Sequence, residues 1–330
     1  MPPRLHTIQG IEDGSRRIAA AAFGDDQLVL ADASSLEVLR LAGSSSTSDY
    51  KVALDQEPKA VHISATGTFV LAIDPQRIRV WAREAHEPVF EAAIIAKTSV
   101  GAAFARLGER EVLLYESAQA RLEAFDLPSC ERFFGGGTET FLATTGVAIA
   151  GGTRIALVGY YRGEGKHSFA LVPTEELTLP PELLFTRFRK KRPIADYAYR
   201  LAVGPCGVDA LVVFRDPEDD EEPDDEDDEQ FVDSSAHADV RGLHGFYLRG
   251  TDGALLAKRS WDGPVKSSAH LAATRAWIAA DCGEQIALVP LAATATATTI
   301  TARWLAASSN GSRVLVQDEN GTLSIIDLRS

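Results

Sequence analysis

Short runs of alternating apolar and polar residues, bounded by turn residues, recur along the whole chain. A hexamer of this kind occurs seven times, at residues 36–41, 78–83, 122–127, 169–174, 243–248, 286–291 and 323–328. Alternation with a period of two is typical of β-strands, and no long stretch keeps the 3.6-residue period of an amphipathic helix. The pattern predicts an all-β protein built from one repeated unit.

The spacing of the hexamers indicates which all-β architecture the chain adopts. Their fourth residues lie 42, 44, 47, 74, 43 and 37 positions apart, and a period of about 40–45 residues is that of a four-stranded propeller blade. A second apolar strand precedes each hexamer, and in five repeats an acidic residue follows this strand: Asp32, Asp74, Glu116, Asp281 and Asp318. We expect these carboxylates to accept hydrogen bonds from backbone N–H groups at tight turns.

Two turns support a common repeat, because residues 64–68 (SATGT) and 308–312 (SSNGS) occupy the same place in the second and seventh units. In period and strand pattern nearly the whole chain resembles a WD-repeat β-propeller. The position of the WD dipeptide holds Trp81-Ala82, Phe125-Asp126 and Ile326-Asp327. The Gly-His pair of that family is missing, so the chain resembles a divergent member without the family's hydrogen-bond network.

We therefore predict a single domain over residues 1–330, a seven-bladed β-propeller of four-stranded blades. The blades are predicted at residues 18–54, 58–94, 99–134, 145–188, 196–260, 268–302 and 303–328. The seventh blade lacks an outer strand, and an open sheet edge invites aggregation. We expect residues 4–9 to pair with residues 323–328 and close the ring.

Charge is concentrated in one segment. The 330 residues include 33 Lys and Arg against 47 Asp and Glu, a net charge of −14, and twelve of the acids lie in residues 216–229. Such a run repels itself and buries nothing, so we predict a disordered acidic loop at residues 216–241 of blade five. Without these twelve acids the chain has 35 acids against 33 bases and is nearly neutral.

A basic run at residues 187–192 is expected between the outer strand of blade four and the inner strand of blade five. The resemblance to WD-type propellers implies that this connection and the acidic loop leave the same face. The candidate interaction face combines the two runs: Arg187, Arg189, Lys190, Lys191, Arg192, Asp219, Asp220, Glu221, Asp224, Asp225, Glu226, Asp227 and Asp228. Solvated loops, mutual charge pairing and docking of a charged protein are all compatible with the runs.

Sequence motifs for catalysis or for a cofactor are weak. The seven histidines form no metal-binding pattern, and Cys130, Cys206 and Cys282 lie far apart, so we expect free thiols. Residues 163–168 (GEGKHS) lack the first glycine and the Ser/Thr of a phosphate loop and are interpreted as a hairpin. We predict no catalytic residue, metal or cofactor. We assign Trp81, Trp277 and Trp304 to packing between blades, and Trp261, after an outer strand, is the tryptophan whose exposure needs testing.

The favoured function is a non-catalytic scaffold or adaptor that presents blade loops to a protein partner. We expect a monomeric, cytoplasmic protein, because no apolar run is long enough for a membrane span and net negative charge opposes nucleic acid. Two alternatives stay open. One is a propeller enzyme, a hydrolase or lyase with a polar site at the central channel, and the other is an acidic-loop binder of basic proteins.

Overall fold

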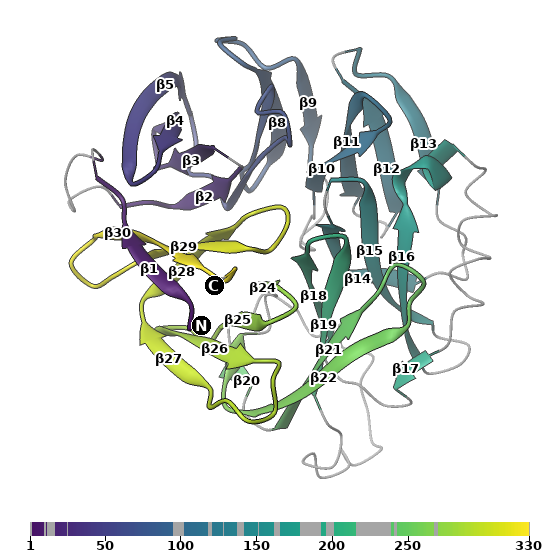
Figure 1. The fold of residues 1–330 in the computed structure, drawn as a ribbon. Helices are drawn as coiled ribbons and strands as arrows, with labels where there is room; N and C mark the ends of the chain where they lie inside the picture. Colours follow the sequence, from purple (N-terminus) through teal and green to yellow (C-terminus); the bar gives the residue numbers. More distant parts are fainter. Residues whose placement is uncertain are drawn as a thin grey trace, which may run out of the picture.

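The structure, a computed structural model, shows seven four-stranded antiparallel sheets in its described residues, arranged as blades around a central axis (Figure 1). The described residues are 2–9, 11, 17–24, 26–94, 102–117, 121–127, 129–136, 142–150, 152–161, 166–178, 193–195, 201–215, 239–240, 243–266 and 270–329. The architecture confirms the predicted all-β, seven-bladed propeller. No helix in this part of the chain has the length and apolar character that crossing a membrane requires.

Each blade begins with its innermost strand. Blade one contains β2 (Ala20–Phe23), β3 (Gln27–Ala31), β4 (Ser35–Ala42) and β5 (Ser45–Ala53). Blade two contains β6 (Ala60–Ile63), β7 (Phe69–Ile73), β8 (Arg77–Ala82) and β9 (Phe90–Ala93). Blade three contains β10 (Ala102–Leu107), β11 (Arg110–Ser117), β12 (Arg121–Asp126) and β13 (Arg132–Gly136). Blade four contains β14 (Leu142–Ala150), β15 (Arg154–Tyr161), β16 (Lys166–Pro173) and β17 (Pro193–Ala195).

The last three blades continue this order. Blade five contains β18 (Leu201–Cys206), β19 (Asp209–Arg215), β21 (Leu243–Arg249) and β22 (Leu255–Asp262). Blade six contains β24 (Leu271–Ala273), β25 (Trp277–Asp281), β26 (Gln285–Pro290) and β27 (Thr298–Thr301). Blade seven contains β28 (Arg303–Ala307), β29 (Arg313–Gln317), β30 (Leu323–Asp327) and β1 (Arg4–Thr7). Outside the blades lie a 3-10 turn, η1 (Thr174–Thr178), and two short strands, β20 (Asp239–Val240) and β23 (Val265–Lys266).

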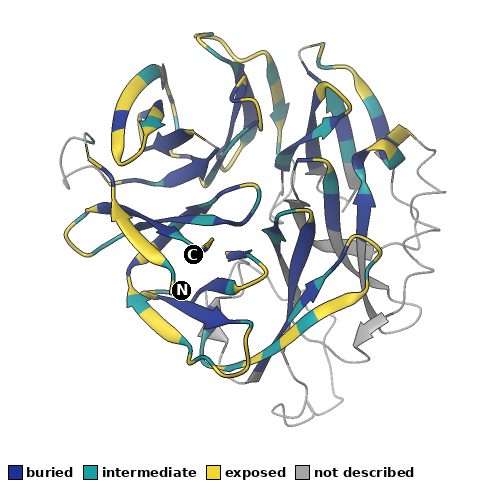
Figure 2. Cartoon of the chain, in the orientation of Figure 1, coloured by how far each residue is buried: buried dark blue, intermediate teal, exposed yellow. Residues whose placement is uncertain are grey.

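The repeated hexamers form the third strand of each blade, and the apolar runs before them form the second. All residues of β3 and β7 are buried, because a sheet in a propeller packs against a neighbouring blade on both faces. The outer strands β22 and β27 are largely exposed (Figure 2). Continuous apolar runs therefore mark the middle strands, and mixed sequences mark the rims.

The core is divided into clusters that lie between neighbouring blades. Trp81 packs with residues of blades one and two, and Trp304 packs with residues of blades six and seven. Trp277 is partly buried against the second of these clusters, and Trp261 is partly buried against the cluster of blades five and six. The predicted role of Trp81, Trp277 and Trp304 in packing between blades agrees with these contacts, and Trp261 is partly buried as well.

The N-terminal strand β1 is the outer strand of blade seven. It pairs antiparallel with β30, from Arg4 opposite Asp327 to Thr7 opposite Ser324. The chain then continues toward blade one, where the Gln9 N–H donates to Ser44 O (2.6 Å) and Gln9 O accepts from the Ser46 N–H (3.0 Å). Residues 4–9 thus pair as expected with the C-terminal strand and also contact the outer edge of the first blade.

The order of elements differs from the prediction around both charged runs. Residues 193–195 form β17, the outer strand of blade four, so the basic run precedes this strand instead of following it. A three-residue edge strand that begins with proline gives too little apolar pattern to be recognised from sequence. The predicted place of this run in the chain, after the outer strand of blade four, is therefore wrong, and residues 187–192 themselves lie outside the described residues.

The acidic segment connects β19 to β21, the second and third strands of blade five. Residues 216–238 lie outside the described residues, as do residues 241 and 242. Asp239 and Val240 form β20, which pairs with β23 after the outer strand of the same blade. Within the predicted disordered range of 216–241, the two described residues thus form a short strand.

Candidate functional site

Four of the five acidic turn residues are structural. Asp32 Oδ1 accepts hydrogen bonds from the N–H groups of Ser34 (2.9 Å) and Ser35 (2.7 Å), and Asp74 Oδ1 accepts from two N–H groups in the same way. Asp281 Oδ1 accepts from the Gly283 N–H (2.9 Å), and Asp318 Oδ1 accepts from the N–H groups of Asn320 (2.9 Å) and Thr322 (2.8 Å). The interpretation as turn-stabilising carboxylates is confirmed for these four, and the side chain of Glu116 lies outside the described set.

The turns between the first and second strand of each blade, here called the inner turns, surround one end of the propeller axis. Those of blades two and seven have the same hydrogen bonds: Ser64 Oγ accepts from the Phe69 N–H (3.1 Å), and Ser308 Oγ accepts from the Arg313 N–H (3.0 Å). Gly67 has a φ of 72° and Gly311 a φ of 69°, in the region that favours glycine. Residues 64–68 and 308–312 therefore form the same type of turn in two blades.

The inner turn of blade seven reaches the inner turn of blade five. The Gly207 N–H donates to Asn310 O at 2.6 Å, which joins the two turns directly. A Cβ atom on Gly311 would lie 1.9 Å from Pro205 O, so glycine alone permits this approach. The turn itself is braced by Asn310 Oδ1, which accepts from Ser308 Oγ (2.9 Å), Ser312 N–H (3.0 Å) and Ser312 Oγ (2.7 Å).

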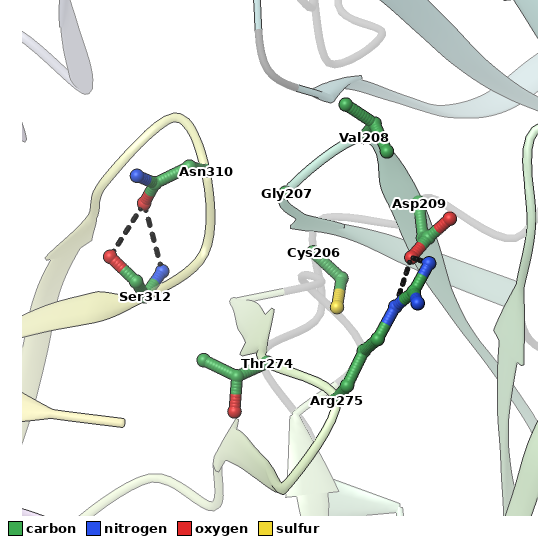
Figure 3. A pocket seen from close by; sticks show the side chains of 8 residues that line it. All are labelled: Cys206, Gly207, Val208, Asp209, Thr274, Arg275, Asn310 and Ser312. Atoms are coloured by element: carbon green, nitrogen blue, oxygen red, sulfur yellow. Dashed lines mark hydrogen bonds and ion pairs between the residues drawn. The ribbon is translucent and has the colours of Figure 1, made fainter. Parts of the chain in front are cut away.

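A recess lies among the inner turns of blades five, six and seven (Figure 3). Its volume is about 340 Å³, within the range of small-ligand pockets. The residues that line it are Cys206, Gly207, Val208, Asp209, Thr274, Arg275, Asn310 and Ser312. We call this site the inner-turn recess.

One ion pair dominates the electrostatics of the inner-turn recess. Arg275 Nε and Nη2 both donate to Asp209 Oδ2, at 3.0 and 2.9 Å. The Asp209 side chain is 4% exposed and the Arg275 side chain 72% exposed. The buried carboxylate therefore holds an accessible guanidinium in a fixed orientation, as Figure 3 shows.

Other polar groups of the recess have partners within the protein. Thr274 Oγ1 donates to Leu328 O (3.0 Å) and accepts from the N–H groups of Ala276 (3.2 Å) and Trp277 (3.1 Å). Burial raises the pKa of the Cys206 thiol to about 12, and the Asp209 carboxylate adds to this effect while Arg275 opposes it. Cys206 is thus a neutral, buried thiol at pH 7, in agreement with the predicted free cysteines.

The innermost strands around the axis consist mainly of alanine and other apolar residues, such as AAAF in β2 and AAFARL in β10. Small side chains suit strands that converge on one axis. Among the titratable residues of these strands is His62 in β6, where burial lowers the pKa to about 4. The imidazole is therefore neutral at pH 7.

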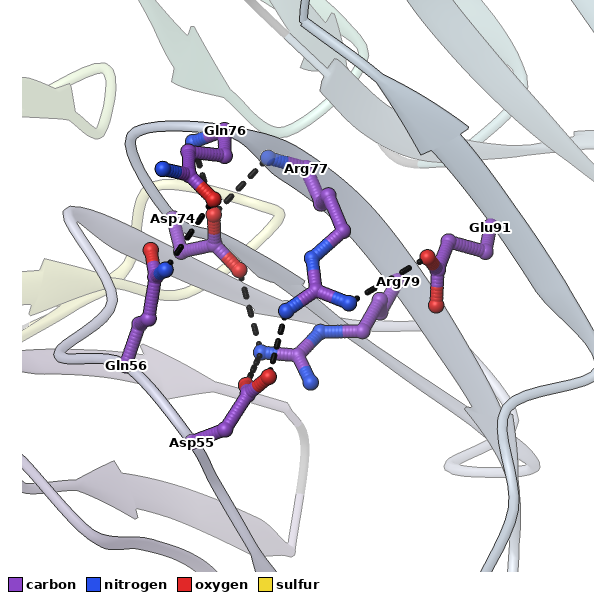
Figure 4. Close-up of polar contacts among 7 residues, drawn as sticks. All are labelled: Asp55, Gln56, Asp74, Gln76, Arg77, Arg79 and Glu91. Carbon is purple, nitrogen blue, oxygen red and sulfur yellow. Dashed lines mark hydrogen bonds and ion pairs between the residues drawn. The ribbon is translucent and has the colours of Figure 1, made fainter.

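A second polar cluster lies on blade two, near the end of the propeller opposite the inner turns, and it joins blade two to the connection from blade one (Figure 4). Arg79 Nη2 contacts Asp74 Oδ2 (3.0 Å) and Asp55 Oδ1 (2.6 Å), and Arg77 pairs with both Asp55 and Glu91. Loss of water raises the pKa of Asp55, but hydrogen bonds from Arg79 and Arg77 outweigh it and hold the pKa below its ordinary value. These ion pairs connect the segment after β5 to β8, and the charged groups of the cluster are paired with one another.

The candidate interaction face predicted from sequence, residues 187–192 and 219–228, lies outside the described residues. The structure instead brings together residues of the inner-turn recess, which lie in three turns: Asp209 and Thr274 are 65 positions apart, and Arg275 and Asn310 are 35 positions apart. Their sequence signals are ordinary turn signals, such as Asn310-Gly311, and nothing in them indicates a shared site. The described residues contain no group of His, Cys, Asp and Glu suited to a metal ion.

Comparisons with known proteins agree on the fold. No protein-family model matches the chain, and no curated protein matches it. Among solved structures, it is similar to hydrazine synthase of Kuenenia stuttgartiensis, with 11% identity, a TM-score of 0.60, and coverage of 98% of this chain and 99% of the other. It is also similar to the β-propeller domain of Cps50 (Swd1) from Myceliophteria thermophila, with 10% identity, a TM-score of 0.57 and the same coverage. The chain is a seven-bladed β-propeller, and at this identity the likeness shows the fold alone.

Proposed function

We propose that the protein is an interaction platform that docks a protein partner on its inner turns, around the inner-turn recess. The observation that carries this proposal is the fixed guanidinium of Arg275, which a buried carboxylate orients while most of the side chain stays exposed. Arginine is enriched at the energetic centres of protein interfaces. A preorganised side chain loses little conformational entropy on binding, so this arrangement favours recognition.

The surroundings of Arg275 support the same function. Val208, at the tip of the blade-five turn, is 50% exposed, which places an apolar side chain beside the cation. The turn that carries Val208 is held by the Gly207–Asn310 hydrogen bond, and the turn that carries Arg275 is held by the hydrogen bonds of Thr274 Oγ1. A rigid surface with apolar and charged groups side by side has the composition of a docking site.

The geometry favours binding over catalysis at this site. Asp209 is paired with Arg275, so its carboxylate has no free role as a general base, and the raised pKa keeps the Cys206 thiol protonated and non-nucleophilic at pH 7. One of the similar structures is named as a synthase, but a likeness of 11% identity carries no activity to this chain. A propeller enzyme would require catalytic residues that come together outside the inner-turn recess.

The test is affinity capture with the intact protein and with two surface variants, followed by reconstitution of binding with the purified partner. Val208→Asp combined with Arg275→Glu should abolish retention, because it places acids where the platform offers an apolar group and a cation. Arg132→Glu, an exposed change on the outer strand of blade three, is the matched control and should retain the partner. A partner retained equally by all three proteins, or by none, would overturn the proposal.

The acidic run offers a second candidate docking surface for a protein partner, which can be tested separately from the inner turns. The acidic segment is attached to blade five between β19 and β20, and β20 pairs with β23 after the outer strand. A partner that docks on residues 216–229 would be lost on their deletion and kept by the inner-turn variants. Comparing the two sets of variants therefore separates the two surfaces.

A further inference from the structure

We propose that the inner-turn recess receives the C-terminal carboxylate of a partner chain together with the aliphatic side chain of its last residue. This inference rests on the proposed function and names the chemistry of the partner at the same site. The first argument is the stereochemistry of Arg275. A guanidinium can bind a carboxylate along its Nε–Nη2 side or along its Nη1–Nη2 end.

Asp209 occupies the Nε–Nη2 side of Arg275, because the two donors meet Oδ2 at 3.0 and 2.9 Å. At the Nη1–Nη2 end, Nη1 has no hydrogen-bond partner within the described part of the chain, and Nη2 has a second N–H besides the one directed at Asp209. With 72% of the side chain exposed, this end is accessible to a second planar oxyanion. A carboxylate presents two oxygens at the separation that this end requires, so a carboxylate can bind there through two hydrogen bonds.

The second argument is the apolar character of the neighbouring groups. Val208 is half exposed at the rim, and the buried Cys206 thiol is kept neutral by its raised pKa. The hydroxyl of Thr274 and Oδ1 of Asn310 are used by internal hydrogen bonds. A ligand therefore meets a cation, the amide NH2 of Asn310 and apolar surface, which suits a carboxylate next to an aliphatic side chain.

The third argument concerns the position of the carboxylate within its chain. Turns of blades five, six and seven bound the inner-turn recess, and the Gly207–Asn310 hydrogen bond joins the first to the last. An internal segment of a partner would need a groove open at two ends. The turns that bound the recess favour a chain end over an internal segment, so we assign the C-terminal carboxylate rather than an acidic side chain.

The experiment titrates the full-length protein with three peptides and follows binding by NMR. The probes are acetyl-Gly-Gly-Ala-Val with a free carboxylate, the same peptide as its C-terminal amide, and acetyl-Gly-Gly-Val-Asp amide, whose carboxylate lies on a side chain. We expect saturable binding of the free acid and at least about tenfold weaker binding of the amide. No binding of the free acid up to about 10 mM overturns the proposal. Equal or tighter binding of the side-chain acid overturns the assignment to a chain end.

Variants locate the site. Arg275→Gln should weaken binding of the free acid at least about tenfold, and Arg132→Gln, a similarly exposed arginine on blade three, should leave it unchanged. Because Arg275→Gln leaves Asp209 buried without its cation, Val208→Asp provides a second test at an exposed position and should weaken binding by repulsion. Unchanged affinity in a folded Val208→Asp protein overturns the proposal. If a partner docks on the inner turns while the free acid does not bind, the platform stands and the carboxylate assignment fails.

Discussion

At the scale of single residues, the structure explains why small or acidic residues occupy particular turn positions. Gly311 permits the contact between the turns of blades seven and five, and Asp32 replaces missing turn hydrogen bonds with its own carboxylate. Both residue types are readable from sequence as turn signals. The contact that each turn makes with a distant blade is not, because it depends on how the blades close into a ring.

Comparing Gly311→Ala with Gly43→Ala separates two contributions to the loss of stability, the steric clash of the new Cβ atom and the strain of the backbone. Both glycines have a positive φ, of 69° and 66°, but a Cβ at position 43 meets nothing within 4 Å whereas one at position 311 would lie 1.9 Å from Pro205 O. We expect Gly43→Ala to lose about 1 kcal/mol of unfolding free energy, from backbone conformation alone. Gly311→Ala should lose about 1–3 kcal/mol more, measured by urea unfolding. Equal losses would show that the turn of blade seven does not pack against blade five.

Asp32 makes stability depend on pH in a narrow acid range. Burial raises the pKa of its carboxyl, but hydrogen bonds from Ser34 and Ser35 dominate and lower it to about 2, against an ordinary value of 3.8. The stabilisation is therefore complete above about pH 4 and is lost as pH falls toward 2. The difference in unfolding free energy between the wild type and Asp32→Asn should shrink over that range, by at most about 2 kcal/mol because the group is partly solvated. If the difference in unfolding free energy between the two proteins stays constant from pH 5 to pH 2, Asp32 does not contribute this stabilisation.

At the scale of strands, the sequence predicts most of the fold because each blade repeats one pattern. Continuous apolar runs such as residues 69–73 mark strands buried on both faces, and the hexamers mark the third strands. Outer strands are less predictable, since they face solvent and need no apolar pattern, and β17 has only three residues. The inner-turn recess could not be predicted, because its residues become neighbours only when the blades close.

Removal of β1 should destabilise the whole ring. This strand covers the outer edge of β30, and Ile8, which is buried between blades seven and one, donates its N–H to Leu323 O at 2.9 Å. Deletion of residues 1–10 should lower the melting temperature by more than about 5 °C, because it exposes a sheet edge and removes contacts between two blades. Deletion of residues 1–3 leaves β1 intact and is the control. Equal melting temperatures of the two deletions and the wild type would contradict closure by β1.

At the scale of the molecule, the net charge of −14 describes one segment rather than the propeller. Twelve of the 47 acids lie in residues 216–229, and the other 316 residues carry 35 acids and 33 bases. The described ion pairs, such as Arg79 with Asp74 and Arg275 with Asp209, further neutralise the blades locally. Long-range electrostatic attraction of a partner must therefore originate mainly from the acidic segment.

Replacing the twelve acids of residues 216–229 by Asn and Gln tests whether the long-range electrostatic attraction originates in this segment. The replacement leaves the length of the segment unchanged. The melting temperature should stay within about 2 °C, because none of the described strands includes these residues and a run of like charges contributes little to folding. Binding of polylysine, measured by calorimetry at low ionic strength, should fall at least about tenfold, since the remaining charges nearly cancel. In the intact protein the same binding should weaken steeply toward 0.15 M salt, where the screening length is about 8 Å. Equal binding by both proteins, or binding by the intact protein that is insensitive to salt, would place the attraction on the blades instead.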